Sequence, residues 1–308
     1  MKNAIILSLF AAMLLTGCGA DNLADRVYAQ AIGLSGGKPP QTSVSQCPSG
    51  AKVGGEPLIL SLQGFETENC RTVQASDIGD ALRLVEAQAG GRVFAGHTEL
   101  IVLDGSVTLD GVQTLFFEEE LSPACKVAFA PQQYLASHDS TDLVHTVRMA
   151  ERNALLPETD LSSVLDEWLG FYETALLPSP GGSVPGMVLL HKDGAFRRLT
   201  EAERRGLLYL RKPPRRMQLE GLGEVQDMTL RKDFSDGKAH FSLTMKAENA
   251  DSSEKSLIEQ ALLTDCSAAA AVLQSENADV IGVQLLLERE EITLPARLPD
   301  IEVTVHCR

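Results

Sequence analysis

Apolar residues recur along the chain at two spacings, which predict both strands and helices. Alternating or continuous apolar runs bounded by Gly, Pro or polar residues predict strands at 27–34, 42–45, 58–62, 94–103, 126–130, 187–190, 217–222, 225–232 and 239–247. Helical spacing predicts helices at 77–89, 112–117, 134–153, 161–176, 200–210 and 251–275. Two further apolar segments, 280–287 and 301–306, complete the pattern. Because strands and helices mix without a regular alternation, the pattern predicts α+β domains with mainly antiparallel or mixed sheets.

Capping residues fix several helix ends. Ser76 or Asp77 can cap the first helix, and two capping boxes, Thr200-x-x-Glu203 and Asp251-x-x-Glu254, open two later ones. The predicted inner stripe of the helix at 251–275 consists of Leu257, Ala261, Thr264, Ala268 and Val272.

A Pro- and Gly-rich stretch at 178–186 predicts a linker between two domains. The expected organisation is a leader at 1–17, an N-terminal α+β domain at 18–177, the linker, and a C-terminal α+β domain at 187–308.

The start of the chain has the pattern of a secretory leader. Lys2 is followed by an uncharged apolar run at 4–15, too short to cross a bilayer as a helix. The run ends in Leu15-Thr16-Gly17-Cys18, in which small residues precede a cysteine as in a bacterial lipobox. We therefore expect cleavage before Cys18 and a diacylglyceryl group on its thiol, since two acyl chains anchor stably where one does not. An ordinary signal peptide or a transmembrane anchor with an accidental cysteine is the alternative.

Composition narrows the possible partners. The 308 residues carry a formal charge of -15, so a nucleic acid would be repelled and is not expected as a partner. Five cysteines remain after Cys18 and none forms a C-x-x-C pair, so the common zinc and redox spacings are missing. They are either small buried hydrophobes or partners in disulfides, and the sequence leaves both open.

No motif predicts catalysis or a cofactor site. The segment Gly181-Gly182-Ser183-Val184-Pro185 departs from a nucleophile elbow, because Pro stands at the last Gly position. His138, Asp142 and His145 would share one face of a helix, which is metal-like, but a solvated helix start is the simpler interpretation. His97, in a predicted apolar strand, is interpreted as a structural residue. We therefore expect a protein that is not an enzyme and has no metal or cofactor.

One segment departs from the acidic average. Between 197 and 216 lie eight basic residues, opposed only by Glu201 and Glu203. This basic segment contains Arg197, Arg198, Arg204, Arg205, Arg211, Lys212, Arg215 and Arg216. It is either a solvated helix and loop, or a dock for an acidic partner loop or for lipid headgroups, with Arg204, Arg205, Arg211, Lys212, Arg215 and Arg216 as the binding residues.

In order along the chain, these segments resemble the Ger(x)C family of spore germination lipoproteins. The lipobox is followed by Val27-Tyr28-Ala29-Gln30-Ala31-Ile32-Gly33-Leu34, similar to the family's first strand, and then by 77–89, similar to its helix. Further resemblances are Gly91 to His97, Leu100 to Leu103, Glu118 to Pro123, Lys126 to Ala130, Gly194 to Thr200 and Ala278-Asp279-Val280-Ile281-Gly282. The chain departs from the family directly after Cys18, where Gly19-Ala20-Asp21 replaces Trp-Asp.

The resemblance implies a function and a location. It implies the lipid-anchored C subunit of a germinant receptor, on the outer face of the spore inner membrane, assembled with two integral-membrane subunits. It further implies a role in receptor assembly or signalling, without catalysis.

Two other classes of function compete. A solute-binding lipoprotein of a membrane transporter would need a deep cleft between two domains of similar topology, and the two halves differ in their predicted elements. An envelope hydrolase would need a nucleophile beside a base, or a filled metal shell.

Overall fold

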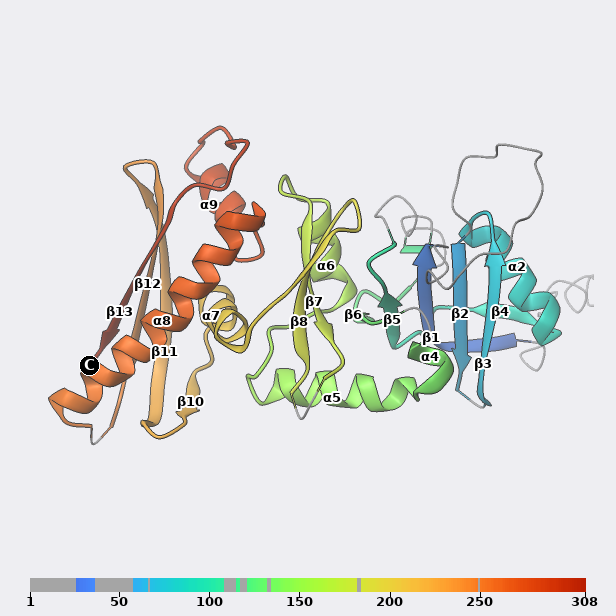
Figure 1. Cartoon of the computed structure of the whole chain (residues 1–308), viewed down its shortest axis with the longest axis horizontal. Coiled ribbons are helices and arrows are strands. Elements are labelled where there is room, and N and C mark those ends of the chain that lie inside the picture. Colours follow the sequence, from blue (N-terminus) through green and yellow to red (C-terminus); the bar gives the residue numbers. More distant parts are fainter. Residues whose placement is uncertain are drawn as a thin grey trace, which may run out of the picture.

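The computed structural model describes residues 26–36, 58–65, 67–107, 115–116, 121–131, 134–181, 184–248 and 250–308. Within these ranges three sheets lie in a row along the long axis, each packed against helices (Figure 1). Two sheets are mixed and one is antiparallel, so the predicted α+β class is confirmed. The predicted leader, Cys18, Cys47, Glu118 and the strand predicted at 42–45 lie outside the described residues.

The N-terminal sheet is buried on both faces. Its strands run in the order β3-β2-β1-β5-β6, and β4 pairs with the first part of β1. Their bounds are β1 Arg26–Gly36, β2 Leu58–Gly64, β3 Thr67–Ala75, β4 Arg92–Phe94, β5 Leu100–Leu103 and β6 Lys126–Phe129. Because β1, β5 and β6 are parallel, helices can cover both faces, which explains the continuous apolar run in β5.

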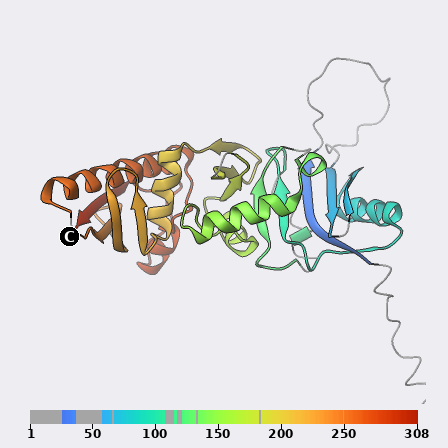
Figure 2. The same cartoon turned by 90° about the horizontal axis from the view of Figure 1, so that it is seen from below.

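Of the helices whose bounds the structure describes, four cover that sheet, two on each face. Ile32 and Ile101 pack in one cluster with α2 (Ile78–Ala89) and α6 (Leu161–Trp168). Ala31 and Leu100 point the other way, into a cluster with α4 (Tyr134–Ser137) and α5 (Ser140–Arg152). In Figure 2, α5 runs along the side of the molecule from the N-terminal sheet toward the C-terminal elements.

The middle sheet joins two cores. It has the order β7-β8-β9, with bounds Thr174–Ser179, Gly186–His191 and Phe196–Arg198. Leu177 and Val188 belong to the N-terminal core, whereas Leu176 and Leu189 belong to the C-terminal core. Successive strand residues point to opposite faces of the sheet. Because each face packs against one of the two cores, this short sheet is apolar on both faces.

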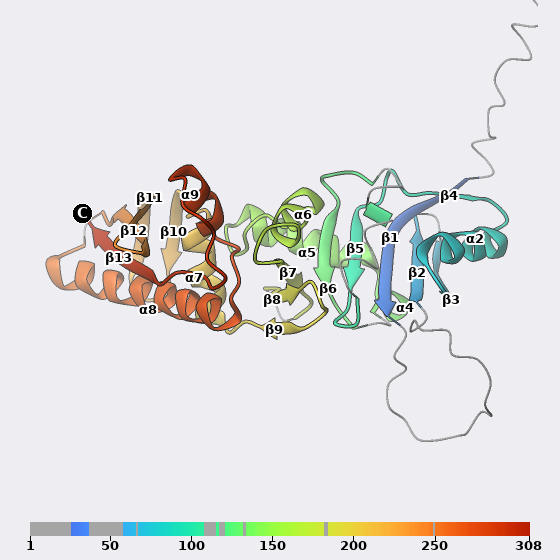
Figure 3. The ribbon, with the colours of Figure 1, turned by 90° about the horizontal axis from the view of Figure 1, so that it is seen from above.

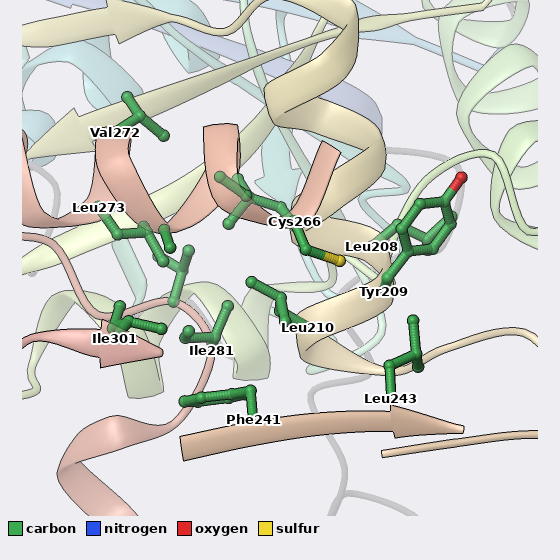
Figure 4. Packing of buried hydrophobic residues seen from close by; sticks show 14 of the residues in the cluster. Leu208, Tyr209, Leu210, Phe241, Leu243, Cys266, Val272, Leu273, Ile281 and Ile301 are labelled. Atoms are coloured by element: carbon green, nitrogen blue, oxygen red, sulfur yellow. The ribbon is translucent and has the colours of Figure 1, made fainter. Parts of the chain in front are cut away.

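The C-terminal elements form a sheet packed against three helices. The sheet has the order β10-β11-β12-β13. The strands are β10 Arg216–Leu219, β11 Gly223–Ser235, β12 Lys238–Lys246 and β13 Ile301–Cys307, and the helices are α7 Glu201–Arg211, α8 Ser252–Glu276 and α9 Val283–Arg289. Figure 4 shows the core between them, where Leu210 and Cys266 face Phe241 and Leu243. Among the described helices, α8 alone is long and apolar enough to cross a membrane, and here it packs against α7 and β13.

The contact between α7 and α8 depends on Gly206. A Cβ atom added at this position would collide with the carbonyl oxygen of Asp265 and lie 2.8 Å from the Cβ of Ala269. The two helix backbones can therefore approach only because position 206 has no side chain.

The predicted caps are confirmed. Asp77 accepts from the N–H of Asp80, and both predicted capping boxes, at Thr200 and Asp251, have their reciprocal hydrogen bonds. Gly90 ends α2 in the left-handed conformation, with φ of 72°.

Several predicted elements differ from the structure. The helix predicted at 134–153 is broken because Asp139 caps a new helix, α5. The helix predicted at 161–176 ends at Trp168, and β7 follows it. The strand predicted at 94–103 contains a turn, so β4 and β5 are separate strands.

The segment predicted as a linker, 178–186, lies in a hairpin. Pro178 pairs with Met187 and Ser179 with Gly186, within the β7–β8 ladder. Pro178 and Ser179 therefore end one buried strand, and Gly186 begins the next. The two-domain division of the chain stays a prediction.

The inner stripe of α8 was predicted one residue too early. Leu257 is 50% exposed, whereas Ile258, Leu262, Cys266, Ala269 and Leu273 are buried. Of the predicted stripe, Val272 is buried as expected. The close contact at Gly206 turns this face of α8, with Asp265 and Ala269, toward α7. Thr264 and Ala268 have the spacing expected of a buried helix face. Small and polar residues lie on both sides of them, so the sequence did not show which face of the helix is buried.

Candidate functional site

The basic segment binds mainly to the protein's own acceptors. Arg204, with only 10% of its side chain exposed, donates to the carbonyl oxygen of Leu155 and lies 4.0 Å from Glu201. Arg205 forms a two-pronged pair with Asp265, at 2.8 and 3.0 Å. This geometry matches the planar fork of the guanidinium to the two carboxylate oxygens, and it ties α7 to α8.

The end of α7 is bound in the same way. Arg211 contacts the carboxylate of Glu167 and donates to the carbonyl oxygens of Val280 and Glu158. Lys212 pairs with the Glu158 carboxylate at 3.2 Å, with both side chains exposed. Four of the six predicted binding residues therefore already have acceptors within the chain.

Arg215 and Arg216 follow α7 on the exposed surface. They contribute to lowering the pKa of Asp227, although the hydrogen bond from Lys246 has the largest effect. A partner-binding role for the basic segment stays a prediction. Of its six residues, these two arginines have side chains without a hydrogen bond or ion pair to a described residue.

Arg211 also lines a cleft of about 540 Å³ where the middle and C-terminal elements meet. Its other charged residues include Glu167 from α6, Lys232 from β11 and Asp279 from the loop between α8 and α9. We call these four residues the junction cluster. It joins segments that are more than 100 residues apart in the sequence.

Two titratable groups of the cluster have unusual environments: burial lowers the pKa of Lys232 and raises that of Glu167. Burial raises the pKa of Glu167 to about 7, against the opposing effects of Arg211 and of the Leu176 N–H, which donates to its Oε2 at 2.8 Å. A buried carboxyl group whose pKa is near neutrality can exchange a proton under physiological conditions. Its contacts place it as a clasp between α6, β7 and α7.

Asp279 organises the turn before α9. Its carboxylate accepts hydrogen bonds from the backbone N–H groups of Ile281, Gly282, Val283 and Gln284. Gly282 has φ of 83°, a conformation that favours glycine. Lys232 donates to the carbonyl oxygen of Ile281, so strand β11 is also bonded to this turn. The polar atoms of this turn are thus satisfied within the chain.

The arrangement of the junction cluster is that of a structural clasp. Tyr172, which also lines the cleft, has a pKa raised to about 12 by burial and by the charge of Asp279. The lining residues that the structure describes contain no Ser–His or Cys–His pair that could form an activated nucleophile.

The structure separates the residues of the predicted metal-like face. His138 lies before α5, where its ring stacks on that of Tyr134 at 4.3 Å between centroids, while Asp142 and His145 are within the helix. Among the residues that the structure describes, no group of three or more His, Cys, Asp or Glu could hold a metal ion. His97 lies in an exposed turn and not in a strand, where its ring stacks on Tyr28 and meets the ring of Phe94 edge-on.

The described cysteines carry free thiols: Cys70, Cys125, Cys266 and Cys307. Burial raises the pKa of Cys125 and of Cys266 to about 12, so both thiols are protonated at neutral pH. These two cysteines behave as small buried hydrophobes.

Sequence reasoning missed Glu167. A single acidic residue in an amphipathic helix gives no local signal of burial, since its partner Arg211 lies 44 residues away. The segment containing Asp279 was noticed only through its resemblance, and an Asp before Gly in a turn is a signal that could have identified its capping role.

Comparison with known proteins gave one structural likeness. No family model matches the chain, and no curated protein matches it. The structure is similar to the crystal structure of the GerBC protein, with a TM-score of 0.44 and 11% sequence identity, over 88% of this chain and 99% of that chain. A TM-score below 0.5 at this identity carries no argument about what the chain does.

Proposed function

We propose that this chain is the lipid-anchored subunit of a spore germinant receptor and acts in receptor assembly or signalling. In this proposal Cys18 carries the diacylglyceryl anchor on the outer face of the membrane. Two integral-membrane subunits are its partners, and it has no cofactor and no catalytic activity of its own.

The observation that carries the proposal is the ordered series of Ger(x)C-like segments that follows the lipobox. Each segment that the structure describes has a defined structural role. The first, 27–34, lies within β1, and the run at 100–103 is β5. Residues 194–200 lead into the cap of α7, and 278–282 form the turn held by Asp279.

The geometry of the junction cluster is compatible with a protein that transmits or supports contacts. Its charged groups bind one another and nearby backbone atoms, so they hold the middle and C-terminal elements together. A subunit whose two ends contact different partners requires its elements to be held together in this way. Such a role involves no catalytic turnover.

The anchor is tested by replacing Cys18. Cys18→Ser is expected to lose metabolic labelling with palmitate and to appear in the soluble fraction, whereas Cys307→Ser, a matched change at a described free thiol, is expected to keep both. Mass spectrometry of the wild-type N-terminus should find a lipidated cysteine. An unmodified N-terminus, or one at another residue, would contradict the anchor.

The receptor assignment needs a separate measurement. Affinity purification of the detergent-solubilised protein is expected to recover two multi-spanning membrane proteins. Recovery of a tightly retained small ligand without those proteins would instead support a solute-binding lipoprotein of a transporter.

A further inference from the structure

We propose that the surface around the start of β1 binds anionic lipid headgroups of the bilayer that holds the anchor. The proposal rests on the lipid attachment at Cys18 argued above. It assigns a contact to residues of the N-terminal sheet and its loops, outside the predicted basic segment.

The surface contains a pocket of about 490 Å³, which we call the N-terminal pocket. It is lined by the beginning of β1, by the turn between β2 and β3, and by the loop before β5. The residues that matter here are Arg26, Tyr28, Phe65, Arg71 and His97. A volume of this size is in the range of small-molecule sites and is sufficient for a phospholipid headgroup.

The pocket presents the positive charge of two arginines. Neither Arg26 nor Arg71 forms an ion pair with a described residue, and the Arg26 guanidinium lies over the ring of Phe94 at 5.5 Å. The acidic residue that lines the pocket, Glu99, is paired with Arg148 at 3.1 Å. On a chain with a formal charge of -15, this is a local site where a phosphate group can be bound.

Aromatic rings surround these charges. Tyr28, Phe94 and His97 form a contiguous cluster with centroid separations of 5.3 to 6.3 Å. Phe65 is 48% exposed at the edge of the same pocket. Aromatic side chains beside basic ones are the composition found at the membrane–water interface, where rings lie at headgroup depth and arginines reach the phosphates.

The anchor restricts how far this pocket can lie from the bilayer. Arg26 follows Cys18 by eight residues, and a fully extended chain of that length spans at most about 28 Å. The Arg26 end of β1 lies toward the end of the molecule opposite the C-terminus (Figure 3). The tether therefore keeps the N-terminal pocket close to the headgroups, while the C-terminal elements can extend away from the membrane.

The test uses the lipidated full-length protein in vesicles, with Phe65→Trp as a reporter. The natural Trp168 is fully buried, so the unsubstituted protein supplies the background emission. The vesicles contain a phosphatidylcholine with a nitroxide-labelled headgroup, either alone or with phosphatidylglycerol. We expect at least twofold stronger quenching of Trp at position 65 when phosphatidylglycerol is present, since each arginine strengthens binding to an anionic surface roughly fivefold.

Two double substitutions with the same change of charge decide the result. Arg26→Glu with Arg71→Glu is expected to reduce quenching to the phosphatidylcholine level, and Arg215→Glu with Arg216→Glu is expected to leave it unchanged. Arg26→Gln with Arg71→Gln should give an intermediate value, which separates loss of contact from loss of folding. Equal quenching with and without phosphatidylglycerol, or no effect of the Arg26 and Arg71 changes, would overturn the proposal. If the anchor itself were absent, the protein would not sediment with vesicles of phosphatidylcholine alone, so the two failures are distinguishable.

Discussion

The basic segment and the N-terminal pocket show opposite relations between charge in the sequence and charge on the surface. The basic segment has eight cationic residues within 20 positions, yet Arg204, Arg205 and Arg211 are bound to acceptors on neighbouring elements. The pocket takes two arginines from positions 26 and 71, separated by 45 residues, and neither has an ion pair with a described residue.

The difference shows that the density of charge along a chain does not measure the charge available to a partner. Arginines on α7 face other elements of the fold, and there the low dielectric requires that each buried cation has an acceptor. Arg71 lies on the edge strand β3, and Arg26 lies at the start of β1, where β1 pairs with β4. Both side chains are partly exposed, so no such requirement applies to them. Substitutions in the basic segment should therefore affect stability first.

The largest effect is expected for Arg211→Ala. Removing the guanidinium leaves the buried Glu167 carboxylate without its cation and two backbone carbonyl oxygens without a donor. Breaking a buried pair from one side typically costs 3–5 kcal/mol, and we expect a loss of about 3 kcal/mol because Glu167 can take up a proton. Urea denaturation measures the free energy of unfolding. The control is Arg215→Ala at an exposed position, which should change this free energy by no more than about 0.5 kcal/mol. Similar losses for both variants would show that Arg211 is not a buried partner.

The second effect is a pH dependence that comes from Glu167. Its pKa is raised in the folded state to about 7 from an ordinary value of 4.5, so between these values the folded protein binds a proton that the unfolded chain has released. Stability from this group is therefore complete below about pH 4.5 and is lost as the pH rises through 7, by up to about 3 kcal/mol. Denaturation curves at several pH values for wild type and Glu167→Gln isolate this contribution. A difference between the two proteins that stays constant from pH 5 to pH 8 would contradict the raised pKa.

The smallest effect is expected for Lys212→Ala. The Lys212 and Glu158 side chains are 73% and 63% exposed, so water screens their pair. Such pairs contribute about 0–1 kcal/mol, and we expect a loss below about 0.5 kcal/mol. A double-mutant cycle with Glu158→Ala measures the coupling directly. A coupling as large as that between Arg211 and Glu167 would remove the distinction between the exposed and buried parts of the basic segment.

The sequence predicted the fold well where the signal is local. The caps at Asp77, Thr200 and Asp251 were identified because a cap depends on residues three or four positions apart. The strand β3 was missed because its residues lack a regular apolar alternation, although it pairs with β2 at the sheet edge.

The errors concern features that depend on distant contacts. The Pro- and Gly-rich stretch at 178–186 has the composition of a linker, and only pairing between β7 and β8 identifies it as a hairpin. The pairing of Arg211 with Glu167 and of Arg205 with Asp265 depends on how α7 packs between α6 and α8, which no local pattern specifies. The N-terminal pocket was missed for the same reason, because β1 and β3 bring its two arginines together only across the intervening strand β2.

The close contact at Gly206 has a consequence for the evolution of homologous chains. A homologue that preserves this helix crossing is expected to retain glycine in the column aligned with position 206, because even one methyl group would meet backbone and not a movable side chain. Substitutions in that column should co-occur with a smaller residue opposite, at the position of Ala269, or with a shifted helix. An alignment in which larger residues occupy both columns together would indicate that those chains pack the two helices differently.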